Sequence, residues 1–192
     1  IYKLESTKIK EKVDLGISTI WDQGDLGSCT GHGVARAITI LKKKNIDLSR
    51  LFLYWMGRFK MGSEFINVDS GAMIRDVVKM ASKYGACRYL KYQTSNKDFA
   101  KAPKNYAWND AWRTRIFEYN RCDNNYSIKV ALSNGWPVVV GVLVYESFLN
   151  PINGIIVPHS ENDYIGCHCR CIDGYKEEKG HFILTNSWGK GW

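Results

Sequence analysis

The segment Asp22-Gln23-Gly24-Asp25-Leu26-Gly27-Ser28-Cys29-Thr30 places a cysteine directly after a tight, glycine-containing loop. Apolar residues follow it at helical spacing, at Val34, Ala35, Ile38 and Leu41. The run Lys42–Lys44 then suits the negative end of a helix. Cys29 is therefore predicted in the first turn of a helix, where free N–H groups and the positive end of the dipole favour thiolate over thiol. Such a thiolate is a competent nucleophile only with a base or cation nearby.

Length and charge bound the class of protein. A chain of 192 residues suits one domain over residues 1–192, with about 20–110 mainly helical and about 111–192 mainly β. No apolar run approaches the length of a membrane span, so none is expected. The net charge of +8 is spread along the chain, and its longest basic run is Lys42–Lys44. This favours a generic basic surface over nucleic-acid binding.

The six cysteines do not form the evenly spaced framework of a small secreted scaffold; they are Cys29, Cys87, Cys122, Cys167, Cys169 and Cys171. If Cys29 is a free nucleophile, the remaining five cannot all pair internally. The chain is therefore not expected to depend on disulfides, which favours a reducing compartment weakly.

Local patterns predict helices first and strands later. A short strand is expected near residues 12–15, a helix capped by Ser49, a loop over 57–69, and a helix opened by Ser70-Gly71 and stopped by Gly85. Residues 86–125 show no clear period. Ser127 is expected to cap a short helix, and strands are expected over about 138–145, 167–175 and 181–186.

The chain offers four histidines as partners for Cys29, namely His32, His159, His168 and His181. A histidine within a strand is more often structural than catalytic. The tail Thr185-Asn186-Ser187-Trp188 favours His168, because an amide at the end of the next strand can hold an imidazole ring and an indole can shield that bond from water.

These residues resemble the papain family of cysteine peptidases, and the bacterial, archaeal and viral members more than the lysosomal ones. The loop ending at Cys29 resembles the family's nucleophile motif, Gly166-Cys-His168 its histidine strand, and the stretch from Asn186 to Trp192 its asparagine motif. His168 and Asn186 follow Cys29 by 139 and 157 residues, close to the spacing of papain-type enzymes. The resemblance extends from about residue 12 to the end.

The resemblance implies a role for each matching position. Cys29 would attack the scissile carbonyl as a thiolate paired with the His168 imidazolium, Asn186 would orient the ring, and Gln23 would donate to the oxyanion. Trp188 would cover the His168–Asn186 bond. The positions expected to contact substrate are Ser70, Gly71, Cys167 and Trp188. The implied fold is α+β, with a helical half, a twisted antiparallel β-barrel-like half and the cleft between them.

Two features depart from the family pattern. Leu26 stands where many relatives have a disulfide cysteine. The strand Cys167–Asp173 alternates three cysteines with His168 and Arg170, so His168 faces away from the thiols; this makes buried thiols a better reading than a metal site. Arg170 and Asp173 on a core strand require charged partners or an irregular β half.

Three functions stay open from the sequence. The first is an endopeptidase, or an aminopeptidase if an added segment blocks the cleft; the second is an acyltransferase or amidase on the same residues. The third is a weak or inactive binding module, which the intact set of Gln23, Cys29, His168 and Asn186 disfavours. No cofactor or metal is implied. The expected partners are a protein or peptide substrate and an inhibitory propeptide or larger parent polypeptide, and a monomer is expected.

Overall fold

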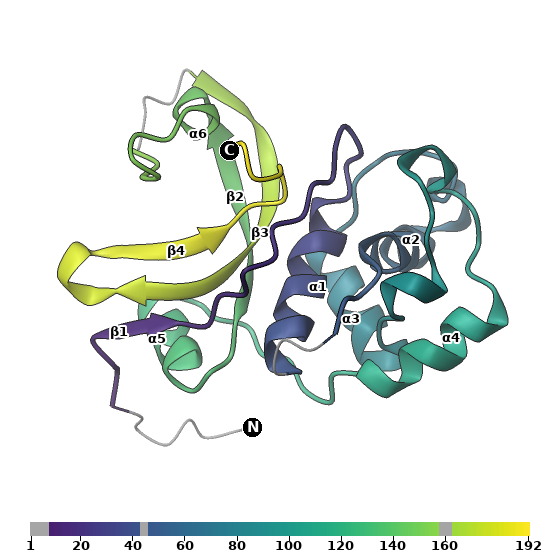
Figure 1. The fold of residues 1–192 in the computed structure, drawn as a ribbon, viewed down its shortest axis with the longest axis horizontal. Coiled ribbons are helices and arrows are strands. Elements are labelled where there is room, and N and C mark those ends of the chain that lie inside the picture. The colour runs from purple at the N-terminus through teal and green to yellow at the C-terminus, as the bar shows by residue number, and fades with distance from the viewer. Residues whose placement is uncertain (1–7, 43–45, 158–162) are drawn as a thin grey trace.

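A computed structural model describes residues 8–42, 46–157 and 163–192, and it separates into two halves that lie side by side (Figure 1). The helical half contains α1 (Cys29–Leu41), α2 (Arg50–Met61), α3 (Ile74–Tyr84) and α4 (Asn105–Ala111). The β half contains β1 (Lys12–Asp14), β2 (Val138–Tyr145), β3 (Tyr164–Lys176) and β4 (His181–Thr185), with α5 (Asn125–Ser133) and α6 (Glu146–Leu149). Short 3-10 helices cover Ser63–Phe65, Tyr89–Lys91, Asn96–Asp98, Trp112–Thr114 and Glu177–Lys179. The predicted α+β class is confirmed.

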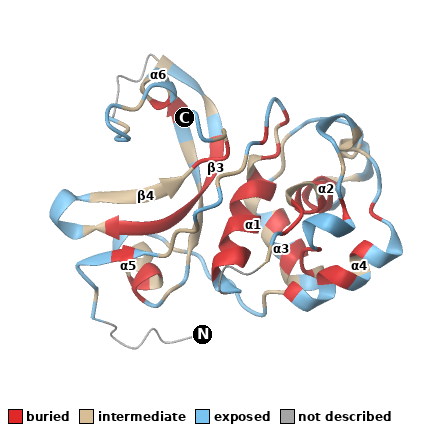
Figure 2. Cartoon of the chain, viewed as in Figure 1, coloured by how far each residue is buried: buried red, intermediate tan, exposed pale blue. Residues whose placement is uncertain are grey.

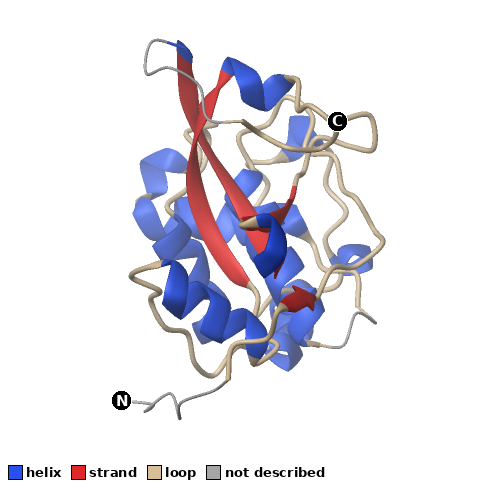
Figure 3. Cartoon of the chain, turned by 90° about the vertical axis from the view of Figure 1, so that its left-hand side faces the viewer, coloured by secondary structure: helices blue, strands red, loops and turns tan. Residues whose placement is uncertain are grey.

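The sheet is built around the long strand β3, which curves through the β half (Figure 3). β2 pairs antiparallel with β3 from Val138 opposite Ile172 to Tyr145 opposite Tyr164, with a bulge near Val144. β1 and β4 pair antiparallel with the second part of β3. Within the described residues β1, β2 and β4 each pair only with β3, so the sheet does not close. The expected barrel-like half is therefore an open, curved sheet.

Helix α1 is the element that joins the two halves. Residues 30–40 of α1 are all buried, and the helix is the most continuously buried one in Figure 2. A Cβ on Gly31 would lie 2.3 Å from the Arg50 carbonyl oxygen in α2, and one on Gly33 would lie 3.0 Å from Sγ of Cys169 in β3. The absence of side chains at Gly31 and Gly33 thus allows close packing on both sides of α1, and this packing fixes the start of α1 against β3.

Two predicted boundaries in the helical half are wrong. Helix α2 continues to Met61, through the start of the expected loop over 57–69. Gly57 belongs to the helix because a Cβ there would lie 2.5 Å from Val77 Cγ2, so the missing side chain lets α3 pack closely. Helix α3 begins at Ile74 rather than at Ser70-Gly71, because Gly71 has φ +71° and cannot continue a right-handed helix. Residues 70–73 therefore stay non-helical.

Helix caps were predicted with mixed success. Ser49 caps α2 as expected, since its Oγ accepts from the Phe52 N–H at 3.2 Å. Helix α5 is capped by Asn124 instead of Ser127; the Ser127 N–H donates to Asn124 Oδ1 at 2.9 Å, and Ser127 is the third residue of the capping box. Residues 86–125, which showed no period, contain α4. The predicted roles of Lys43, Lys44 and His159 lie outside the described residues.

A buried ion pair fastens α1 to β3. Arg36 Nε lies 2.7 Å from Asp173 Oδ2, and Thr185 Oγ1 donates to the same oxygen at 2.8 Å. Arg36 also donates to the carbonyls of Ile17 and Thr19 at 3.1 and 3.0 Å. Asp173 thus has the charged partner that the sequence required. Every helix in the described part of the chain is too short or too polar to span a bilayer.

Candidate active site

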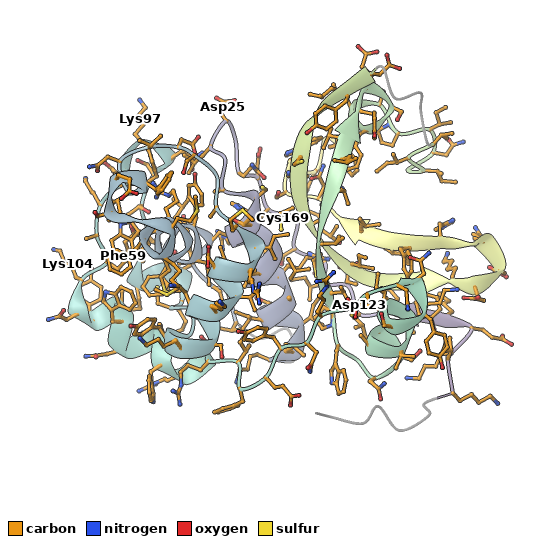
Figure 4. The ribbon with its side chains drawn as sticks, turned by 180° about the vertical axis from the view of Figure 1, so that it is seen from behind. Asp25, Phe59, Lys97, Lys104, Asp123 and Cys169 are labelled. Carbon is orange, nitrogen blue, oxygen red and sulfur yellow. The ribbon has the colours of Figure 1, made fainter. Side chains whose placement is uncertain are left out.

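Cys29 begins α1 at the junction of the two halves, as predicted. Gly33, one turn further along α1, packs on Cys169, which Figure 4 labels at this junction. A backbone hydrogen bond from Cys169 also reaches the Cys29 thiol. The nucleophile candidate is therefore next to the part of β3 that carries His168. All six cysteines are free thiols.

His168 and Asn186 form the hydrogen-bonded pair that the sequence predicted. His168 Nε2 lies 3.0 Å from Asn186 Oδ1, and the Ser187 N–H donates to the same oxygen at 2.8 Å. An amide oxygen only accepts, so Nε2 carries the proton in this bond and Nδ1 is the basic atom of the neutral ring. Trp188 stacks on the imidazole with ring centroids 4.8 Å apart and planes 30° apart. The indole thus covers His168 as expected.

Burial acts against charge on both members of the pair. Burial raises the pKa of the Cys29 thiol, while backbone hydrogen bonds oppose this shift and the Asp69 charge adds to it. Burial also lowers the pKa of His168 to about 4; the bond to Asn186 opposes this shift and the Arg170 cation reinforces it. A thiolate–imidazolium pair therefore needs the attraction between its own two charges in addition to the hydrogen bonds that Cys29 and His168 receive. The presence of this Cys29–His168 ion pair in the protein without substrate stays a prediction.

Gln23 lies buried between the two halves and is held by Ser187. The Ser187 Oγ–H donates to Gln23 Oε1 at 2.6 Å, and the Gln23 N–H donates to the Ser187 carbonyl at 2.8 Å. The Gln23 amide nitrogen donates to the Leu26 carbonyl at 2.8 Å. An amide nitrogen carries two hydrogens, so one remains for an oxyanion. Sequence reasoning missed Ser187, although it lies between Asn186 and Trp188.

Among the residues expected to contact substrate, Gly71 lies beside the loop that ends at Cys29. A Cβ on Gly27 would be 3.5 Å from the Gly71 nitrogen, and the Gly71 N–H donates to the Tyr54 hydroxyl at 3.1 Å. Ser70 is exposed. Cys167 is also exposed, and its Sγ lies 3.4 Å from the Tyr164 hydroxyl on the outer part of β3. The structure thus brings Gly71 next to the Cys29 loop.

Arg170, for which the sequence required a charged partner or an irregular β half, is surrounded by aromatic rings. Its side chain is buried, and its guanidinium nitrogens have no hydrogen-bond partner among the described residues. The guanidinium carbon lies 4.1 Å from the Phe148 ring centroid, 4.4 Å from that of Trp192 and 5.4 Å from that of Trp188. Burial lowers the pKa of Arg170 to about 9, so the cation persists near neutral pH. It shares Trp188 with His168.

Removing this charge should change the pH profile. Because the Arg170 cation lowers the pKa of His168, Arg170→Met should raise that pKa. The limb of the kcat/KM profile that His168 governs should then move to higher pH. Arg170→Lys, which keeps the charge, should leave the limb in place. Equal profiles for both variants, measured from pH 4 to 10, would contradict this electrostatic role.

The other two described histidines, His32 and His181, do not bond to Asn186. His32 is buried in α1, with Nδ1 3.0 Å from the Ser28 carbonyl, and burial lowers its pKa to about 4. His181 begins β4 at the far end of that strand from Asn186. In the described residues no three His, Cys, Asp or Glu side chains are placed to hold a metal ion.

The site and fold are those of the class of papain-like thiol proteases. They combine a thiol at the start of a helix, an imidazole on a strand bound to an amide, and an α+β fold of two halves. The family described as papain family cysteine protease matches residues 5–192. The chain belongs to this family.

Relatives and solved structures agree with this assignment. An uncharacterized peptidase C1-like protein of Acanthamoeba polyphaga mimivirus is 35% identical over 189 residues, covering 89% of this chain and 60% of the relative. Xylellain, a cysteine protease from Xylella fastidiosa, has a TM-score of 0.84 at 32% identity, covering 95% of this chain and 76% of that structure. The proform of the ragweed cysteine protease Amb a 11 has a TM-score of 0.71 at 20% identity, covering 97% and 58%. The chain thus spans about 60% of the length of its viral relative.

Proposed function

We propose that the chain is a cysteine peptidase that hydrolyses peptide bonds through a Cys29 acyl-enzyme. The observation that carries the proposal is the 3.0 Å bond between His168 and Asn186, placed on β3 where the first turns of α1 pack. The alternative of an inactive binding module is less favoured, because Gln23, Cys29, His168 and Asn186 are all present and their elements meet at one junction.

In the proposed reaction, Cys29 Sγ attacks the scissile carbonyl carbon while its proton passes to His168 Nδ1. The carbonyl oxygen becomes an oxyanion, which receives hydrogen bonds from the Gln23 amide and the Cys29 backbone N–H. His168 then protonates the leaving amine, and a thioester on Cys29 remains. Water attacks the thioester with His168 as the base and releases the acid. Asn186 keeps the ring in the required orientation throughout.

The proposed substrate is an extended peptide that lies along Ser70 and Gly71. Gly71 has a left-handed backbone, with φ +71°, which favours glycine at this position. Because glycine has no Cβ, a peptide backbone can approach closely there. Cleavage within peptide chains is part of this proposal. An inhibitory propeptide belongs to the same proposal, because the structural neighbours include a proform.

Covalent labelling tests the proposal directly. Incubation with an epoxysuccinyl cysteine-peptidase inhibitor should add one inhibitor mass to the wild type, and Cys29→Ala should abolish both the adduct and peptide cleavage. Cys122→Ala is a matched control, because Cys122 is a partly buried thiol beside Ser127 of α5 and its replacement should leave the adduct in place. If the wild type showed no adduct in reducing buffer, the binding-module alternative would replace the peptidase. Adding an amine acceptor separates hydrolysis from acyl transfer.

A further inference from the structure

Asp69 places a carboxylate at the edge of the nucleophile loop. The Gly27 N–H lies 3.0 Å from both Oδ1 and Oδ2 of Asp69, and Gly27 precedes Cys29 by two residues. A Cβ on Gly27 would lie 3.0 Å from Oδ1 of the same carboxylate. Asp69 is exposed, and its carboxylate contacts Gly27 where that residue approaches Gly71.

The carboxylate is fixed by neutral donors. The Tyr54 hydroxyl donates to Oδ1 at 2.5 Å, and the same hydroxyl accepts from the Gly71 N–H. Burial and Asp69 together raise the pKa of Tyr54 well above its ordinary range, so Tyr54 stays a neutral donor. Because Gly27 and Tyr54 hold the carboxylate from two directions, its position relative to the Cys29 loop is well defined.

No cation neutralises Asp69 by direct contact among the described residues. The buried Arg58 acts on it only at longer range, because its own guanidinium donates to backbone carbonyls, including those of Ile66 and Phe99. A carboxylate accepts about four hydrogen bonds, and the donors from Tyr54 and Gly27 leave capacity on Oδ2. The site therefore presents a positioned negative charge on a chain with net charge +8.

We infer that Asp69 selects substrates in which a lysine or arginine contributes the scissile carbonyl. This inference rests on the proposed function. A peptide along Ser70 and Gly71 brings its scissile carbonyl to Cys29, so the side chain of that residue leaves the backbone beside Gly27. The missing Cβ of Gly27 lets the Asp69 carboxylate lie directly against this loop, within reach of that side chain. A guanidinium or ammonium group there forms a charge-assisted hydrogen bond with Oδ2.

The inference is tested with two peptides that differ only in arginine or citrulline at this position. Citrulline keeps the shape of arginine and lacks its charge. The wild type should cleave the arginine peptide with roughly tenfold higher kcat/KM, as expected for one charge-assisted hydrogen bond. Asp69→Asn should bring the ratio close to one, and added salt should reduce the wild-type ratio.

Asp25→Asn provides the matched control. Asp25 is an exposed acid of the same loop, and Figure 4 shows it at the loop's tip, away from the Cys169 junction. Its replacement should preserve the ratio. Equal cleavage of both peptides by the wild type would overturn the inference and leave the peptidase proposal standing. An equal loss on both peptides in Asp69→Asn would assign Asp69 a structural role and also overturn the inference. Absence of both cleavage and the Cys29 adduct would overturn the proposed function itself.

Discussion

Replacement of His168 by asparagine should lower kcat/KM for peptide hydrolysis by a factor on the order of 10⁴ or more. In the proposed mechanism, His168 takes the proton from Cys29, protonates the leaving amine and activates water, so its removal affects both halves of the reaction. Asparagine keeps a polar side chain near Asn186 but has no basic nitrogen. Since His168 is buried beneath Trp188, water cannot readily replace it as a base.

The measurement compares kcat/KM and the rate of epoxysuccinyl labelling in the two proteins. His181→Asn is the control, because His181 is a half-buried histidine at the far end of β4 from Asn186 and should retain activity. Circular dichroism of both variants establishes that the fold persists. A His168→Asn variant that kept a tenth or more of wild-type activity would show that another group serves as the base.

The order of motifs along the chain predicted most of the fold, because each motif carries a local constraint. Cys29 after a glycine loop and before a helical pattern specified the start of α1, and the β-branched run at residues 138–145 specified β2. Local patterns failed where tertiary packing decides. Gly57 fell within the predicted loop over 57–69, yet α2 continues through it, and its missing Cβ lets α3 pack closely at Val77. Gly71 looked like a helix start, yet its positive φ keeps α3 from beginning there.

The main residues of the candidate site could be predicted from the sequence, whereas the residues that hydrogen-bond to them could not. Cys29, His168 and Asn186 follow from residue type and spacing, and Trp188 lies on the imidazole as expected. Ser187 and Asp69 were not predicted, because their importance comes from contacts with residues 164 and 42 positions away in sequence. A serine and an aspartate in loops have no signal of their own. The only clue was their position beside predicted site residues, since Ser187 follows Asn186 and Asp69 precedes Ser70.

Arg170 is a residue that the sequence marked as unusual but whose contacts it did not predict. Its position on a core strand predicted either a charged partner or an irregular β half. The sheet does contain register shifts, near Val144 and near Ile172, but Arg170 has no acidic partner among the described residues. The guanidinium is surrounded by the rings of Phe148, Trp188 and Trp192 instead. An aromatic ring can stabilise a buried cation through a cation–π contact, and the sequence argument considered only acidic partners. The same strand residue then influences the pKa of His168, two positions away.

Gln23→Ala should lower kcat by about 10²- to 10³-fold and change KM little. The expected reason is that the Gln23 amide donates to the oxyanion, which exists in the transition state and not in bound substrate. Gln93, the other glutamine of the chain, is exposed, and Gln93→Ala should leave both constants unchanged. A KM effect without a kcat effect for Gln23→Ala would identify a substrate-binding role instead.

Ser187→Ala should give a smaller loss, roughly tenfold in kcat, because it removes the hydroxyl that donates to Gln23 Oε1 at 2.6 Å and leaves the donor itself in place. The two changes should not be additive, since Ser187 acts through Gln23 and has nothing to hold once the amide is gone. The double variant should therefore resemble Gln23→Ala alone. A fully additive loss would mean that the Ser187 hydroxyl acts independently of Gln23. The backbone N–H that Ser187 donates to Asn186 Oδ1 is unchanged in Ser187→Ala, so the cycle tests the hydroxyl alone.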